Sequence, residues 1–332
     1  MPASRPPARG ISWRHRTGAA AMTRDDHAFT DIIEQARSNG PRPMAVAHPC
    51  SPEALQGAVE AAEHGIATPI LIAPRAKLTK LAASLDIDLG RYETIDVEHS
   101  HAAAERAVEL VREGFADSLM KGSLHTDEFM SAVLDRAKGI RTDRRISHVF
   151  VMKVESYPRY LFITDAAVNI EPDLATKRDI CQNAIDLCHA LGLARPKVAI
   201  LSAVETINPK IRSTLDAAAL CKMADRGQIK GALLDGPLAF DNAISHAAAD
   251  TKGIESDVAG EPDILLVPDL ESGNMLAKQL TYLAAAASAG IVMGARVPIV
   301  LTSRADDAAG RLASAAVANL YAASRRQQAG SR

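Results

Sequence analysis

Aromatic residues are scarce in this sequence, since six Phe, five Tyr and one Trp make up only 4% of its 332 residues. The core must therefore be built from Ala, Val, Ile and Leu, which suits helices packed closely on a parallel sheet and argues against an all-β fold. Long hydrophobic runs are also missing. The longest weakly polar run, 282–293, is shorter than the roughly 20 apolar residues that cross a bilayer. We therefore expect no membrane-embedded segment.

The sequence also lacks an excess of charge of either sign. Its 38 Lys and Arg against 40 Asp and Glu give a net charge of −2, which argues against a nucleic-acid surface because such surfaces concentrate basic residues. Cysteine is sparse too: the four residues show no C-x-x-C pair and no His spacing of the zinc kind (Cys50, Cys181, Cys188 and Cys221). We expect reduced core cysteines, no resident metal and a cytoplasmic protein.

Short apolar runs alternate with longer segments of helical period from Pro43 onward. This alternation predicts a βαβ series and an α/β fold with mostly parallel sheets. The chain length favours two domains. The Ala-rich stretch at 284–289 is predicted as helix. The predicted strands are 44–47, 69–73, 93–97, 118–120, 148–152, 160–164, 198–201, 231–234, 263–267 and 298–301.

Polar residues follow many of these predicted strands. Ligands of open α/β sheets bind outside the carboxyl ends of the strands, so these residues mark the candidate site. Taken singly, each is more commonly a helix cap or turn former. The set comprises Lys121-Gly122-Ser123, Asp165, Ser202 and Glu205, Asp235-Gly236-Pro237, Asp269, and Thr302-Ser303-Arg304.

Arg304 beside Ser303 is the strongest of these signals. An Arg next to the free amides of the following helix, predicted over about 306–323, makes a site for a tetrahedral anion such as phosphate. Asp306, in the first turn of that helix, either complements the helix dipole or transfers protons.

Two further basic features suggest anion contacts. Lys121 is either a second anion contact or an ordinary solvated lysine. Arg145 belongs to a basic run with Arg141 and Arg144, which is either an exposed loop or a grip for a cofactor that carries a polyphosphate.

Five ordered blocks of sequence together resemble the phosphate acetyltransferase and phosphate butyryltransferase family. The resemblance runs from about Ala45 to Ala323, and five blocks in order make chance similarity very improbable. The blocks are MKGSLHTDEFMSAVL (120–134), DAAVNIEPDLATKRDI (165–180), DGPLAFDNAIS (235–245), PDLESGNMLAKQL (268–280) and VPIVLTSRADDA (297–308).

The resemblance implies a two-domain α/β fold of the isocitrate and isopropylmalate dehydrogenase type, dimeric, with the active site between the domains. The implied reaction is reversible: acyl-CoA and phosphate give acyl phosphate and CoA. Coenzyme A is then a substrate, and no cofactor is permanently bound. We expect a disordered or non-native extension over residues 1–22, a first domain over 23–153 plus 297–324, a second over 154–296, and a tail over 325–332.

The resemblance also assigns roles. Ser303 stabilises the transition state and Arg304 holds the phosphate, while CoA contacts are expected at Lys121, Arg145, Asp165 and Asn274. Acetyl-specific members carry a catalytic Asp seven residues beyond the serine, where this chain has Gly310, and an Arg about 22 residues before it, where this chain has Leu280 and Thr281. The identity of the base is therefore open, with Asp306 as a candidate. Acetyl transfer is the first expectation, and butyryl transfer is the alternative.

Two other functions remain as alternatives. A dehydrogenase of the same fold would need a nucleotide-binding loop, yet no G-x-G-x-x-G follows any predicted strand. It would also need a metal set, and Asp165, Asp235, Asp241 and Asp269 lack the i, i+4 spacing. The other alternative is a relict that binds CoA or phosphate without catalysis, supported by the missing Asp at 310.

Overall fold

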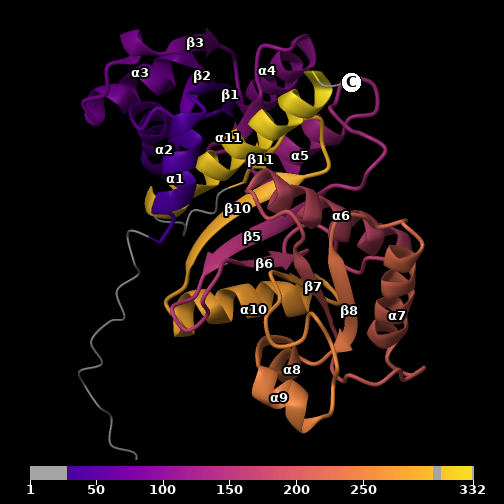
Figure 1. Cartoon of the computed structure of the whole chain (residues 1–332). Helices are drawn as coiled ribbons and strands as arrows, with labels where there is room; N and C mark the ends of the chain where they lie inside the picture. The colour runs from indigo at the N-terminus through magenta and orange to yellow at the C-terminus, as the bar shows by residue number, and fades with distance from the viewer. Residues whose placement is uncertain (1–27, 302–307, 331–332) are drawn as a thin grey trace, which may run out of the picture.

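The computed structural model of the protein describes residues 28–301 and 308–330 (Figure 1). Within these ranges one continuous sheet of 11 strands runs in the order β3-β2-β1-β4-β11-β10-β5-β6-β9-β7-β8. The strands are β1 (Arg42–Ala47), β2 (Ala67–Ala73), β3 (Glu93–Asp96), β4 (Ser118–Lys121), β5 (Ser147–Lys153), β6 (Leu161–Thr164), β7 (Lys197–Leu201), β8 (Leu233–Leu238), β9 (Ile264–Leu266), β10 (Ala287–Met293) and β11 (Ile299–Val300).

The sheet is parallel except at its centre. There β10 pairs antiparallel with both β11 and β5, and β5 pairs antiparallel with β6. As a result, β6 to β9 run opposite to β1, β4 and β11. The α/β class and the mostly parallel sheet are confirmed, although the strands form one sheet. The division into two domains stays a prediction.

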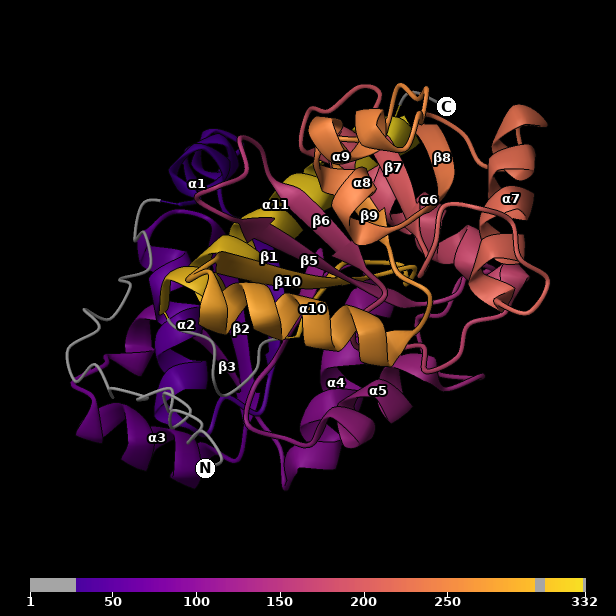
Figure 2. The same cartoon turned by 90° about the horizontal axis from the view of Figure 1, so that it is seen from below.

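Helices cover both faces of the sheet (Figure 2). They are α1 (Thr30–Ser38), α2 (Pro52–Glu63), α3 (Arg75–Ser84), α4 (Ser100–Glu113), α5 (Thr126–Leu134), α6 (Leu174–Ala190), α7 (Arg212–Asp225), α8 (Phe240–Ile244), α9 (His246–Thr251), α10 (Leu270–Leu283) and α11 (Ala308–Gly330), with a 3₁₀ turn η1 (Leu89–Arg91). Helix α2 begins directly after Ser51, whose hydroxyl caps it by accepting the N–H of Ala54 at 3.4 Å.

The two faces of the sheet differ in how their cores are arranged. On one face a single core extends in sheet order from β2 to β7, under α1, α2, α3, α6, α7 and α11. On the other face the described residues form two separate cores, one with α4 and α5 and one with α8, α9 and α10. Alternate residues of each strand serve the two faces, as with Val46 and Ala47 of β1. The central strands β5 and β10 therefore lie where the second face changes from one core to the other.

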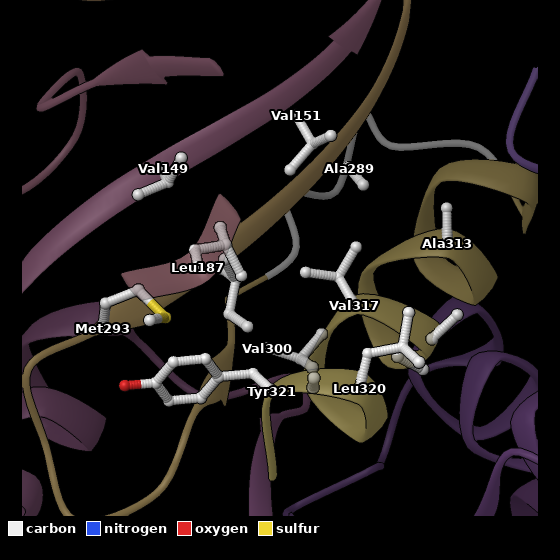
Figure 3. Close-up of a cluster of buried hydrophobic side chains, with 14 of the residues drawn as sticks. Val149, Val151, Leu187, Ala289, Met293, Val300, Ala313, Val317, Leu320 and Tyr321 are labelled. Carbon is white, nitrogen blue, oxygen red and sulfur yellow. The ribbon is translucent and has the colours of Figure 1, made fainter. Parts of the chain in front are cut away.

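The last helix returns to the start of the chain. Helix α11 packs against α1, α2 and β10, and Figure 3 shows Ala313, Val317 and Tyr321 facing Val149 and the other residues of the shared core. Burial of this Ala-rich helix ties the two ends of the described chain together.

Two expectations about secondary structure are wrong. The Ala-rich stretch at 284–289 is not a helix, because α10 ends at Leu283 and strand β10 begins at Ala287. Pairing of residues 287–289 with β5 overrides the helix propensity of alanine, and Ile291 and Val292 favour a strand. Strand β8 also extends further than 231–234, so Asp235-Gly236-Pro237 lie inside it instead of after it.

Candidate functional site

The three residues expected to carry the chemistry, Ser303, Arg304 and Asp306, lie outside the described residues. The structure does describe what flanks them. Strand β11 lies between β4 and β10 and ends at Val300, and α11 begins at Ala308. On one side of the end of β11, the loops at the carboxyl ends of β4 and then β1 therefore follow along the sheet.

Lys121 is the last residue of β4, at the same level as Ala47 of β1. Its ammonium donates to the backbone carbonyls of Gly122 and Leu124, both at 3.1 Å. The side chain therefore folds over its own loop, and its charge stays at the edge of the sheet.

The next two residues of this loop bind the end of β1. Ser123 donates its backbone N–H to the carbonyl of His48 at 2.9 Å, and Gly122 donates to that of Ala47 at 2.8 Å. A Cβ on Gly122 would lie 2.4 Å from the His48 carbonyl oxygen, so only glycine permits this approach.

Asp165 directly follows β6 and is 2% exposed. Its Oδ1 accepts backbone N–H groups from His148, Ala167 and Val168 at 3.1 to 3.2 Å. Its Oδ2 accepts the backbone and the side-chain amide of Asn169. Burial raises the pKa of this carboxyl, and these hydrogen bonds oppose the rise. The carboxylate thus organises the loop 165–169.

Asn274, in the second turn of α10, holds the same loop from the other side. Its side-chain amide donates to the carbonyl of Ala166 at 3.2 Å. Helix α10 begins at Leu270 because Asp269 caps it. The Asp269 carboxylate accepts the N–H of Ser272 at 2.8 Å. Two of the expected CoA-binding residues, Asp165 and Asn274, therefore act on one loop.

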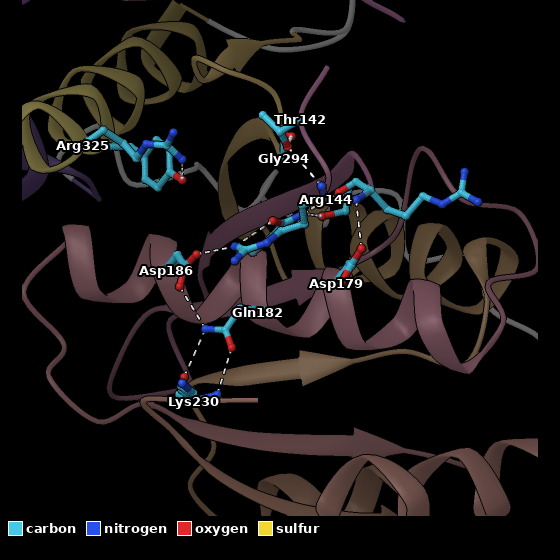
Figure 4. A network of polar contacts seen from close by, with 12 residues as sticks. Thr142, Arg144, Asp179, Gln182, Asp186, Lys230, Gly294 and Arg325 are labelled. Atoms are coloured by element: carbon cyan, nitrogen blue, oxygen red, sulfur yellow. Dashed lines mark hydrogen bonds and ion pairs between the residues drawn. The ribbon is translucent and has the colours of Figure 1, made fainter. Parts of the chain in front are cut away.

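Arg145 lies in the basic loop before β5, directly after Arg144, which Figure 4 labels. Its backbone N–H donates to Asp179 of α6 at 3.0 Å, while its side chain is exposed. The neighbouring Arg144 is paired with Asp186 of α6. The loop is thus fixed to α6 through its backbone and through Arg144, which leaves the Arg145 guanidinium at the surface.

The structure links these segments through one apolar cluster. Val168 of the Asp165 loop, Leu124 beyond Lys121, and Leu301 at the end of β11 pack in the same core. Asn169 adds a hydrogen bond from its side chain to the carbonyl of Ile146 at 2.8 Å, which connects the loop of Arg145. No hydrogen bond joins the side chains of Lys121, Arg145, Asp165 and Asn274 to one another within the described ranges.

The sequence reasoning missed two histidines and Asn169. His48 directly follows β1, so the rule of reading polar residues after strands would have found it. His148 lies within β5 and is 2% exposed, and burial lowers the pKa of its imidazole to about 4. A histidine inside an apolar run gives no indication in the sequence that it is buried or functional.

Two other findings concern ligands and membranes. Among residues 28–301 and 308–330, no cluster of three or more His, Cys, Asp or Glu side chains is arranged to hold a metal ion. No helix in the same ranges combines the length and the apolarity needed to cross a membrane. The four cysteines, all described, are free thiols.

Comparison with known proteins places the chain in a family. The family profile described as "Phosphate acetyl/butaryl transferase" matches residues 101–319. A phosphate acetyltransferase from Rhizobium meliloti is 64% identical over 298 residues, 90% of this chain and 94% of that protein. A phosphate butyryltransferase from Clostridium acetobutylicum is 43% identical over 295 residues, 89% and 98% of the two chains.

A solved structure agrees with these sequence relatives. A branched-chain phosphotransacylase from Enterococcus faecalis V583 superposes with a TM-score of 0.75 at 30% identity, covering 85% of this chain and 99% of that one. The expected similarity of the fold to that of isocitrate and isopropylmalate dehydrogenases stays a prediction. The chain therefore belongs to the phosphate acetyl/butaryl transferase family.

Proposed function

We propose that the protein is a phosphate acetyltransferase, which moves an acetyl group reversibly between coenzyme A and inorganic phosphate. The observation that carries the proposal is the 64% identity to the Rhizobium meliloti phosphate acetyltransferase over 90% of the chain. The phosphate butyryltransferase of Clostridium acetobutylicum shares 43%, which favours acetyl as the main acyl group. Gly310 and Leu280 depart from the acetyl-specific pattern and support a range that includes longer acyl groups.

In this proposal Arg304 holds the phosphate and Ser303 donates a hydrogen bond to the oxyanion that develops on the acyl carbonyl. A guanidinium suits phosphate because it donates two parallel hydrogen bonds. A hydroxyl placed at the developing oxyanion stabilises the transition state more than the ground state. The CoA sulfur attacks the acyl phosphate directly, and no covalent acyl-enzyme is needed.

The remaining expected residues take different parts in binding coenzyme A. Arg145 has an exposed guanidinium on a fixed backbone, which suits contact with the phosphates of CoA. Lys121 adds positive charge at the edge of β4. Asp165 and Asn274 act indirectly, because both are engaged with the loop 165–169. Coenzyme A is a substrate in this scheme and not a resident cofactor.

The reaction takes place, in this proposal, between two domains made of residues 23–153 with 297–324 and of residues 154–296. The two separate cores on one face of the sheet support this division. We also propose a cytoplasmic homodimer. Free thiols are usual in the cytoplasm, and α10 exposes Met275, Tyr282 and Leu283, which are 64%, 68% and 72% exposed in the single chain.

The proposal is tested by following thioester formation from CoA and a series of acyl phosphates. We expect kcat/KM to be highest for acetyl phosphate and to be lower for butyryl phosphate by at least about tenfold, since each extra methylene is worth about 1–3 kcal/mol in a fitted pocket. Higher kcat/KM for butyryl phosphate would replace acetyl by butyryl. No thioester with any acyl phosphate would contradict the enzyme proposal and favour a binding relict.

A further inference from the structure

His48 occupies an unusual position at the carboxyl end of β1. Its backbone has a φ of 54°, in the left-handed region that few residues other than glycine adopt. Its carbonyl oxygen accepts the N–H of Cys50 at 2.7 Å, and both the N–H and the hydroxyl of Ser123 at 2.9 and 3.0 Å. These contacts fix the backbone of His48 against the end of β4.

Ser123 also fixes the imidazole. Its hydroxyl has one proton, which is donated to the His48 carbonyl. The contact of 3.2 Å between the Ser123 hydroxyl and Nδ1 of His48 therefore has Nδ1–H as the donor. In the neutral ring this leaves the lone pair on Nε2. Among the described residues, Ser123 is the one hydrogen-bond partner of this ring.

The position of His48 is close to the carboxyl end of β11. Strands β1, β4 and β11 are neighbours, with Ala47 level with Lys121 and Met120 level with Val300. Since neighbouring strands lie about 4.8 Å apart, the backbone of His48 lies about 10 Å from the end of β11. One substrate molecule can therefore contact both.

The charges around the ring favour its neutral form. Burial and the nearby Lys77 of α3 lower the pKa of His48, against a smaller opposite effect of Glu128 of α5. On the facing loop, Lys121 is bound to carbonyls of its own loop. Burial raises the pKa of Cys50, which lies two residues beyond His48. The imidazole is thus neutral at pH 7 and can accept a proton.

We propose that Nε2 of His48 is the base that takes the proton from the thiol of coenzyme A. As the sulfur attacks the acyl carbonyl, the carbon–sulfur bond forms, the carbon–oxygen bond to phosphate breaks, and phosphate leaves with that electron pair. In the reverse direction the imidazolium returns the proton to the departing sulfur. This inference rests on the function proposed above, and it fills the role left open by Gly310.

Replacement of His48 by Asn separates the chemical role from a structural one. Asparagine tolerates the left-handed backbone, and its amide can donate to Ser123 in place of Nδ1. It has no second nitrogen, however, that could accept a proton as Nε2 does. We expect kcat at pH 7 to fall by about 10²-fold or more. The deficit should shrink as the pH rises through about 8.5, where a thiol ionises without a base. His64→Asn, at the exposed end of α2, is the matched control.

Activity of His48→Asn within twofold of the wild type at pH 7, or a deficit that does not change with pH, overturns the inference. If His48→Asn fails to fold, as judged by circular dichroism, Ser123→Ala decides. It should lower kcat about tenfold, leave the dissociation constant for CoA unchanged, and melt cooperatively, and unchanged kcat would overturn the inference. A wild type that forms no thioester would instead contradict the proposed function.

Discussion

Asn169 donates two hydrogen bonds to one oxygen of Asp165, from its backbone N–H at 3.0 Å and from its side-chain amide at 2.6 Å. The side chain of Asn169 also donates to Ile146 at 2.8 Å. This pair therefore binds the loop after β6 to the segment before β5, and a change at either residue should alter both.

Asp165→Asn should destabilise the fold and lower activity. One carboxylate oxygen becomes an amide that faces N–H donors, so hydrogen bonds to a buried charge are lost at a cost of about 3 kcal/mol. Urea unfolding measures this loss. Asp173→Asn is the control, because Asp173 is an exposed helix cap and Asn caps equally well. Equal stability of the two variants would contradict the organising role of Asp165.

Gly122→Ala should be destabilising and nearly inactive. Its Cβ would lie 2.4 Å from the His48 carbonyl oxygen and 2.5 Å from that of Ala47, and relieving such backbone overlap costs about 1–3 kcal/mol. The loops of β1 and β4 would then separate. Gly90→Ala serves as a control, since the nearest atom there belongs to the flexible, exposed side chain of Asp88. Compared with Gly90→Ala, we expect Gly122→Ala to have a lower free energy of unfolding and a lower turnover number.

The stability of the protein should fall with pH between 6.5 and 4 because of His148. Burial lowers its folded pKa to about 4, so the unfolded chain takes up the proton first. The stability contributed by the neutral ring is full above pH 6.5 and is lost as the pH falls, by about 3 kcal/mol in total.

The variant His148→Leu tests this assignment by flattening the dependence of unfolding free energy on pH. Exposed His64→Gln should leave the dependence as it is. A wild-type slope that persists in His148→Leu would assign the effect to other groups.

Ser303→Ala should lower kcat by about 10²-fold, as expected for the loss of one donor to an oxyanion. Arg304→Gln should in addition raise the KM for phosphate, because the bidentate contact is lost. Ser84→Ala, an exposed serine of α3, is the control. Unchanged turnover in a folded Ser303 variant would remove the site assignment.

Leu283→Glu and Met275→Glu should convert the proposed dimer into monomers, because a charge on the apolar face of α10 is costly to bury. Sedimentation measures the change. Phe115→Glu, at a residue that is 62% exposed elsewhere on the chain, should leave the mass unchanged. A wild type that sediments as a monomer would contradict the homodimer.

The sequence predicted most of the fold because buried parallel strands give continuous apolar runs. It predicted the wrong structure for 284–289, where local alanine propensity favours a helix while pairing of residues 287–289 with β5 imposes a strand. Distant pairing of this kind has no signature within a short window.

The candidate site was predictable only in part. Lys121 and Asp165 stand out as polar residues after strands. The hydrogen bonds that occupy Asp165 come from its own loop and from His148, and they depend on a turn that composition does not encode. His48 also follows a predicted strand, but the orientation of its ring depends on a contact with Ser123, which is 75 residues away in the sequence.

Strand β11 comes last in the chain but lies inside the sheet, and this order has a consequence for protein synthesis. Strand β4 pairs with β1 early in the chain, but its other edge is covered by β11, which comes after residue 298. While the intervening residues are being translated, the nascent chain carries an open strand edge beside β4. Such edges pair readily with other chains. Translation that stops before β11 and α11 should therefore yield aggregates instead of a smaller folded enzyme, and a soluble, monomeric product truncated at residue 296 would contradict this view.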